Sequence, residues 1–184
     1  MLSPLEPQSL RELDLFADMS DADIQEILNA CEQVEFVSGD TIYDSGEEEQ
    51  ALYILIGGAL QVELEVPKLG ERLIAELACK GVFGEMSFFH PSPHSATVKC
   101  IQDAQLLRLD RANYDLLLGS GSRAATRLAV NAAGLMAARL AATDQWVAST
   151  LEEQQTARIR DKWREFREGM TPTFQFPRGV IGVR

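Results

Sequence analysis

The sequence has few of the features that mark membrane or secreted proteins. Its longest apolar stretch, residues 51–60, contains two glycines and is far shorter than the ~20 residues that a membrane-spanning helix needs. Residues 1–10 have neither a basic start nor an apolar run, so they do not resemble a secretory signal. We therefore expect a cytoplasmic protein with no membrane partner.

Cysteine and histidine are scarce as well. The three cysteines, Cys31, Cys79 and Cys100, form no C-x-x-C pair, which argues against a zinc site, an iron–sulfur site or a disulfide framework. His90 and His94 are the two histidines, and no Ser-His-Asp pattern, metal pair or P-loop accompanies them. We expect free, mostly buried cysteines, no metal, no cofactor and no enzymatic activity.

Positive charge is in short supply. The 17 basic and 28 acidic residues give a net charge of −11. Duplex DNA is bound largely through Lys and Arg at the phosphates, so DNA is not an expected partner. Residues 158–184 are the exception, with seven basic and three acidic residues. This segment is either a solvated helix face or a basic tail that docks on an acidic surface.

The middle of the chain has the pattern of short strands. Between residues 34 and 109, short apolar or alternating runs are separated by turn residues. Gly57-Gly58 is expected to be a turn between two strands, and residues 96–101 and 105–109 are expected to form two more. The pattern predicts an α+β protein built on an antiparallel β-roll (a double-stranded jelly roll) of about eight strands.

Helical patterns flank this region. Ser20 is a typical N-cap residue and Asp23 lies in the first turn that would follow. An alanine-rich helix is expected from Arg123 to about Ala148. The chain is thus divided into N-terminal helices (1–32), a β-roll (33–118), a long dimerisation helix (119–148), and a polar helix with an extended tail (149–184).

The long helix carries a stripe of small and apolar side chains, which suits close packing against another helix. We therefore expect a homodimer with a two-fold seam. The residues expected in that seam are Leu128, Ala132, Leu135 and Ala142.

The segment with the clearest chemistry is GVFGEMSFFHPSPHSATV, residues 81–98. A Gly-Glu pair opens a very short helical turn, a proline-rich loop follows, and a strand of small residues resumes. Free amides at the start of a helix attract anions, and a glutamate in the same turn can accept hydrogen bonds from a sugar hydroxyl. This layout could hold a nucleotide without a metal or cofactor.

The segment resembles the phosphate-binding cassette of the cyclic-nucleotide-binding domain family, whose pattern is roughly F-G-E, a variable loop, and then P-R before small residues. The resemblance extends from about Leu15 to the long helix, roughly three quarters of the chain. It implies a β-roll of bacterial type that binds a nucleotide such as cAMP or cGMP. The cassette residues that it implies as ligand contacts are Gly84, Glu85, Met86, Ser87, His94, Ser95 and Ala96.

Two of these residues need separate comment. The resemblance implies that Glu85 accepts from the ribose 2′-hydroxyl, although it could instead be a surface carboxylate at a helix start. His94 stands where the family has arginine. Because a hydrogen bond to a charged group is worth ~1.5–3 kcal/mol, a mostly neutral histidine predicts cyclic-nucleotide affinity weaker by ~10- to 100-fold. Otherwise His94 is a relic, or part of a site for another ligand.

The end of the long helix also resembles the dimer helix of the catabolite activator, in which polar residues contact the base. Thr143 and Asp144 would take that role, or they simply face solvent. The 35 residues after Ser149 are too few for the helix-turn-helix module of the activators, which again predicts no DNA binding.

The leading hypothesis is therefore a homodimeric sensor of a nucleotide-type ligand that signals to an unidentified protein partner through residues 149–184. The alternative is a degenerate domain that binds no small ligand and acts as a dimeric interaction scaffold.

Overall fold

A computed structural model describes residues 6–66, 70–78, 80–154 and 157–170. The chain divides into two compact units, Met1–Met136 and Ala137–Arg184, which are described separately. In chain order the elements are the 3-10 helices η1 (Pro7–Leu10) and η2 (Asp14–Phe16), then α1 (Asp21–Ala30), β1 (Glu32–Phe36), β2 (Thr41–Tyr43), β3 (Ala51–Val66), β4 (Gly70–Ala78), β5 (Val82–Phe83), α2 (Glu85–Phe89), β6 (Thr97–Asp110), α3 (Arg111–Gly119), α4 (Arg123–Gln154) and α5 (Ala157–Met170).

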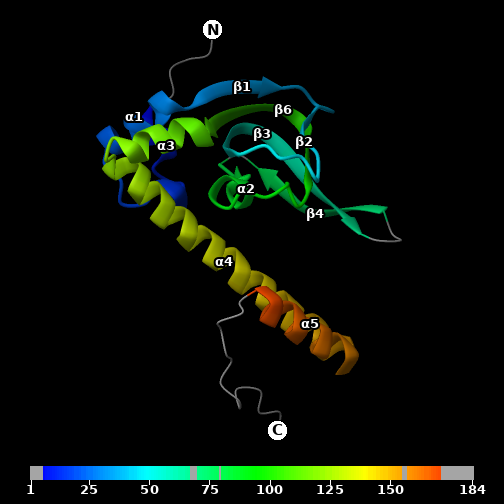
Figure 1. Cartoon of the computed structure of the whole chain (residues 1–184). Coiled ribbons are helices and arrows are strands. Elements are labelled where there is room, and N and C mark those ends of the chain that lie inside the picture. The colour runs from blue at the N-terminus through cyan, green and yellow to red at the C-terminus, as the bar shows by residue number, and fades with distance from the viewer. Residues whose placement is uncertain (1–5, 67–69, 79, 155–156, 171–184) are drawn as a thin grey trace. The chain divides into compact units, whose positions relative to one another are not determined.

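The described strands form one antiparallel sheet that rolls around its own core (Figure 1). The path is β1-β6-β3-β4, with β2 also paired to β6 and β5 to β3. The long strands β3 and β6 pair from Ala51 with Asp110 to Glu63 with Thr97. The predicted antiparallel β-roll with N-terminal helices and a long following helix is confirmed.

The expected turn at Gly57-Gly58 is wrong. These residues form an irregularity inside β3, where the register against β6 shifts. Gly58 has φ 90°, and a Cβ there would lie 2.2 Å from the carbonyl oxygen of Asp103, so the backbones approach too closely for a side chain. β3 and β6 each replace two expected strands, and the described sheet has six strands instead of about eight.

The N-terminal segment begins its α-helix where the sequence predicts. Ser20 accepts from the backbone N–H of Asp23, and the Asp23 carboxylate accepts from the Ser20 N–H, which completes a capping box. Helices α1 and α3 lie at the same end of the sheet (Figure 1), where the Asn113 amide of α3 donates to the carbonyl of Ala30 at 3.1 Å. The N-terminal helices are therefore an integral part of the β-roll unit.

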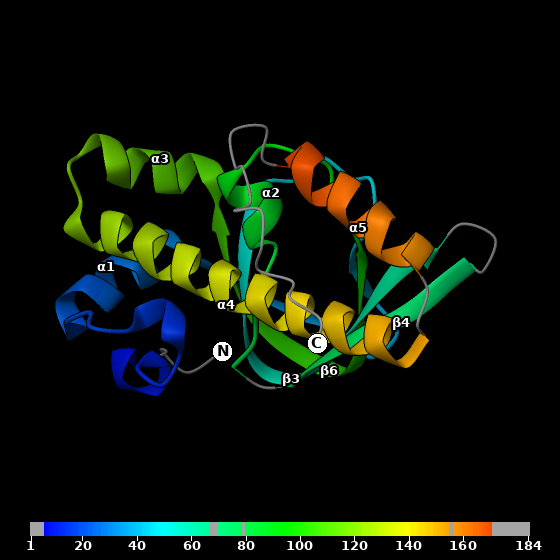
Figure 2. The ribbon, with the colours of Figure 1, turned by 90° about the horizontal axis from the view of Figure 1, so that it is seen from below.

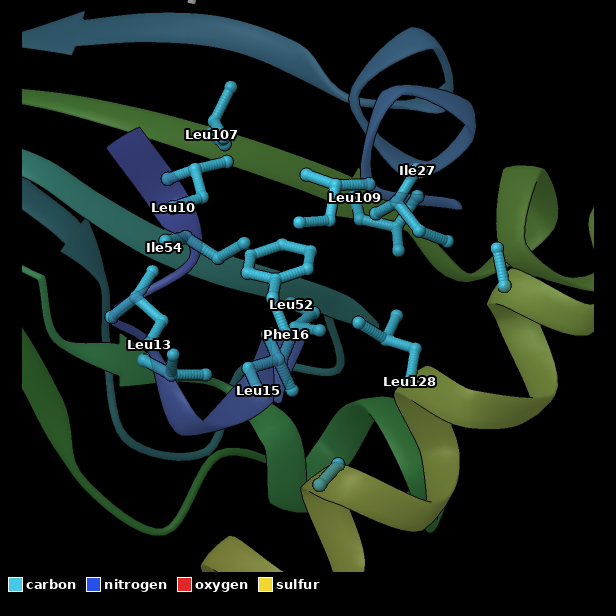
Figure 3. Close-up of a cluster of buried hydrophobic side chains, with 14 of the residues drawn as sticks. Leu10, Leu13, Leu15, Phe16, Ile27, Leu52, Ile54, Leu107, Leu109 and Leu128 are labelled. Atoms are coloured by element: carbon cyan, nitrogen blue, oxygen red, sulfur yellow. The ribbon is translucent and has the colours of Figure 1, made fainter. Parts of the chain in front are cut away.

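One of the two buried cores lies between the roll and its helices (Figure 3). Side chains from the N-terminal segment, β3, β6 and α4 meet there. The labelled members in Figure 3 are Leu10, Leu13, Leu15, Phe16, Ile27, Leu52, Ile54, Leu107, Leu109 and Leu128.

This core corrects the predicted dimer seam. Leu128 and Ala132 are fully buried within their own chain, and Leu135 packs partly against the same cluster. Small and apolar side chains on this side of α4 admit the N-terminal segment of the same molecule, so they are not available to a second copy. Ala142, the fourth predicted member, is exposed.

Polar contacts hold the start of α4 in place. The Asn131 amide donates to the carbonyls of Leu15 and Ala17 at 3.0 and 2.9 Å. Tyr114 of α3 donates its hydroxyl to the carbonyl of Ala125 at 3.2 Å, and Figure 2 shows α3 beside the first turns of α4. The first part of the long helix is thus anchored to the β-roll unit.

The second unit contains the end of α4 and the helix α5. Helix α4 continues to Gln154, beyond the expected end near Ala148. Within this unit, Arg167 pairs with Asp144 at 3.3 Å, and the rings of Trp163 and Phe166 stack with centroids 5.3 Å apart. The predicted extended tail from residue 171 lies outside the described residues. Among the helices described, none has the length and apolar character to cross a membrane.

Candidate ligand-binding site

The turn from β5 into α2 requires a glycine. Gly84 is the N-cap residue of α2 and has φ 76°, in the left-handed region that side chains disfavour. A Cβ on Gly84 would lie 2.5 Å from the carbonyl oxygen of Ala51 on β3. The glycine therefore lets the start of α2 approach the sheet closely.

The short helix α2 is anchored by its apolar end. Phe88 is fully buried, and its ring lies 4.9 Å from that of Phe89 and 5.2 Å from that of Tyr114 on α3. The Arg111 guanidinium donates to the carbonyl oxygen of Phe88 at 2.8 Å. These contacts fix α2 between the sheet and α3.

Buried polar side chains gather in the cassette. Of the five buried polar or charged residues in the described part of the chain, four belong to residues 85–97. Burying such groups costs free energy unless they gain partners, so their concentration in one segment makes it the candidate site. The four are Glu85, Ser87, His94 and Thr97.

Glu85 is only 6% exposed, so it is not the ordinary surface carboxylate that the sequence left as an alternative. The other predicted cassette contacts differ in burial. Met86 is 59% exposed on the outer side of α2, Ser95 is exposed and Ala96 is half-buried.

His94 lies inside the roll. Its ring stacks on that of Tyr43 from β2, with centroids 3.6 Å apart and planes 8° apart. Its Nδ1 lies 3.1 Å from the hydroxyl of Ser87, which in turn lies 3.2 Å from the carbonyl oxygen of Gly84. The side chain thus connects β2 to the first turn of α2.

The acidic loop between β2 and β3 holds the backbone of His94. The His94 N–H donates to the carbonyl of Glu47, and the Gly46 N–H donates to the carbonyl of His94, both at 2.8 Å. Thr97 accepts from the Ser45 N–H at 3.0 Å. Residues 45–47 therefore determine where the cassette loop lies.

Burial lowers the pKa of His94 below its ordinary value of 6.5, and the carboxylates of Glu49 and Glu47 raise it by smaller amounts. The ring is consequently neutral at pH 7. Its Nε2 is buried and has no hydrogen-bond partner among the described residues.

Glu49 belongs to a second group of contacts beside His94. It accepts from the Tyr53 hydroxyl at 2.8 Å and pairs with Arg108 at 2.7 Å, and Arg108 also pairs with Asp110 at 2.7 Å. Sequence reasoning missed Tyr43 and Glu49, because no local pattern shows that β2 and the loop after it close over the cassette.

The two residues predicted to contact a base, Thr143 and Asp144, belong to the second unit. The Thr143 hydroxyl donates to the carbonyl of Arg139 at 2.9 Å, and Asp144 pairs with Arg167. The cassette belongs to the other unit, so contact of these two residues with a ligand stays a prediction.

The described part of the chain contains no group of three or more His, Cys, Asp or Glu side chains that could hold a metal ion. Cys31 and Cys100 are free thiols, as expected, and burial raises the pKa of Cys31 to about 12, which makes it unreactive. Cys79 lies outside the described residues.

Comparison with known proteins shows which proteins this β-roll is similar to. Residues 33–120 match the family model of the cyclic nucleotide-binding domain. A protein of Mycobacterium tuberculosis described as a CRP-like cAMP-activated global transcriptional regulator is 26% identical over 102 residues, which are 55% of this chain and 46% of that protein. The chain thus spans about half the length of the curated relatives that it matches.

Solved structures share the fold. The catabolite activator protein of Thermus thermophilus is 28% identical and superposes with a TM-score of 0.68 over 74% of this chain and 62% of that one. A cyclic nucleotide-binding domain from Methylobacillus flagellatus has a TM-score of 0.71 at 18% identity, over 79% of this chain and 82% of that one. Residues 33–120 of this chain are thus similar in sequence to the cyclic nucleotide-binding domain family, and the β-roll has the fold of these solved structures.

Proposed function

We propose that this chain is a regulatory module, not an enzyme, that senses a nucleotide-type ligand in the cassette of residues 84–97. The observation that carries the proposal is the concentration of buried polar side chains in this segment, within a β-roll similar to the cyclic nucleotide-binding domain family. Candidate ligands are cAMP and cGMP, in keeping with the cAMP-activated regulator to which the chain is similar.

In this proposal the cassette residues have separate roles. Glu85 accepts from a ribose hydroxyl, as the family resemblance implies. The backbone amides of the first turn of α2, near Met86 and Ser87, face the phosphate, as do Ser95 and Ala96. His94 occupies the position of the phosphate-binding arginine and supplies no permanent charge, since its pKa is lowered.

The signal would leave through α4 and the segment that follows it. Helix α4 exposes large apolar side chains, including Leu140 and Trp146, which suit a homodimer contact or a protein partner. We propose a homodimer formed through this exposed part of α4, with residues 149–184 presented to a protein partner.

Calorimetric titration of the ligand-stripped protein with cAMP and cGMP tests the proposal. We expect saturable binding that weakens in Glu85→Ala by about tenfold or more, because a hydrogen bond to a charged group is lost. Glu76→Ala, at an exposed glutamate on β4, is the matched control and should bind like the unaltered protein. Absence of binding in all three proteins would contradict the proposal.

One observation favours the scaffold as a second candidate function. The His94 ring is buried inside the roll, where it is already stacked on Tyr43 and hydrogen-bonded to Ser87. A site closed in this way could support the fold alone. In that case neither cAMP nor cGMP binds, while dimer formation is retained.

A further inference from the structure

The contacts of Ser87 favour one tautomer of His94. Ser87 has one hydroxyl proton, and its oxygen lies 3.2 Å from the Gly84 carbonyl oxygen and 3.1 Å from His94 Nδ1. If the proton pointed to Nδ1, the hydroxyl and carbonyl oxygens would face each other with lone pairs alone. If it points to Gly84, the hydroxyl oxygen accepts from Nδ1–H and both contacts are favourable.

The other ring nitrogen is then a hydrogen-bond acceptor. A neutral imidazole carries one N–H, so Nδ1–H leaves a bare lone pair on Nε2. Nε2 is buried and has no partner among the described residues, and the His94 side chain is 6% exposed. An acceptor in such a place calls for a donor, either a hydroxyl or an N–H.

The charges around the ring also disfavour an anion. The carboxylates of Glu49 and Glu47 act on His94 from the loop before β3, and α2 carries the buried carboxylate of Glu85. Tyr43 covers one face of the ring, and Ser87 occupies Nδ1. Arg108 of β6 offsets the charge of Glu49, with which it pairs at 2.7 Å. A phosphate oxygen at Nε2 would still meet a lone pair instead of a donor, close to carboxylates.

Resting on the proposed function, we propose that at neutral pH this site takes an uncharged ligand of the nucleoside class, which donates a hydroxyl or N–H proton to His94 Nε2. A cyclic phosphate binds there more weakly, and its affinity rises when His94 is protonated and both ring nitrogens are donors. The ligand class is thus set by the tautomer of one buried histidine.

The tautomer can be measured without any ligand. Long-range proton–nitrogen correlation spectra distinguish Nδ1–H from Nε2–H, and His90→Gln, which alters the exposed second histidine, assigns the signals. At pH 7.5 we expect His94 as the Nδ1–H tautomer. Finding Nε2–H or a doubly protonated ring at that pH would overturn the inference and leave the proposed function standing.

Calorimetry with matched ligands tests the selectivity. At pH 7.5 the unaltered protein should bind adenosine or guanosine about tenfold more tightly than the corresponding cyclic monophosphate. His94→Arg should reverse that order, since arginine is a permanent donor to phosphate. If the unaltered protein prefers the cyclic monophosphate, this inference fails and the proposed function stands. If neither protein binds any of these ligands, the proposed function fails with it.

Discussion

The imidazole of His94 lies flat on the phenol ring of Tyr43, with centroids 3.6 Å apart and planes 8° apart. Tyr43 ends β2 and His94 lies in the proline-rich loop between α2 and β6, so this stack fastens the cassette to the sheet. The same contact buries the ring and thereby helps to keep it neutral. A single stack therefore links the stability of the site to its charge.

The stack should contribute measurably to stability. Aromatic pairs add about 0.5–1.5 kcal/mol beyond the area that they bury. A double-mutant cycle of Tyr43→Leu and His94→Leu, followed by urea denaturation, should give a coupling free energy in that range. A coupling free energy near zero would mean that the two rings are merely adjacent.

Burial of His94 predicts a pH dependence of folding. The folded-state pKa lies below the unfolded value of 6.5, so the unfolded chain binds the proton first as the pH falls. The stabilisation is complete above about pH 6.5 and is lost as the pH falls through the folded pKa. Urea denaturation between pH 8 and 5.5 should show this loss.

The matched variants of this experiment are His94→Leu and His90→Gln. The loss of unfolding free energy with falling pH should shrink in His94→Leu, which has no titrating group there, and persist in His90→Gln. If the free energy of unfolding depends on pH equally in all three proteins, groups other than His94 are responsible for the pH dependence.

Two glycines should respond in opposite directions to alanine. Gly84→Ala forces a side chain into a left-handed conformation and against the Ala51 carbonyl, which should destabilise the fold by more than about 1–2 kcal/mol. Gly134→Ala, on an open face of α4, should stabilise it by about 0.5–1 kcal/mol. Thermal or urea denaturation measures both. An unchanged free energy of unfolding in Gly84→Ala would show that α2 does not need this close approach to β3.

The proposed dimer can be tested at Leu140, which is 44% exposed on α4. Leu140→Glu should yield monomers by light scattering, because the interface would bury a charge. Leu116→Glu on α3, where the leucine is 73% exposed, is the control and should leave the oligomeric state unchanged. Leu135 is unsuitable, since it packs partly against the core of its own chain. A dimer that persists in Leu140→Glu would exclude this part of α4 as the dimer interface.

Local signals in the sequence predicted much of the fold. The N-cap at Ser20, the start of α4 at Arg123 and the position of the cassette each depend on a few neighbouring residues. The prediction of a turn at Gly57-Gly58 was wrong, because a glycine pair is as typical of an irregularity within a strand as of a turn. The close approach of the Asp103 backbone, which distinguishes the two, is a long-range contact.

Long-range contacts could not be predicted in the same way. The alanine-rich stripe on α4 fits a second copy of the helix and fits the N-terminal segment equally well, and Leu128 turned out to be buried by the latter. The stack of His94 on Tyr43 joins residues 51 positions apart, and nothing in either segment indicates it.

The most direct test of the account is the affinity of His94→Arg for cAMP and cGMP, measured by calorimetry beside the unaltered protein from about pH 8 to pH 5.5. Arginine restores a permanent charge and a two-pronged contact, so we expect binding tighter by about 10- to 100-fold at pH 7.5. The difference in affinity between the two proteins should narrow as the pH falls below 6.5, because protonated His94 also carries a positive charge and donates to the phosphate. If neither protein binds a cyclic nucleotide at any of these pH values, the cassette is not a nucleotide site and the scaffold takes its place.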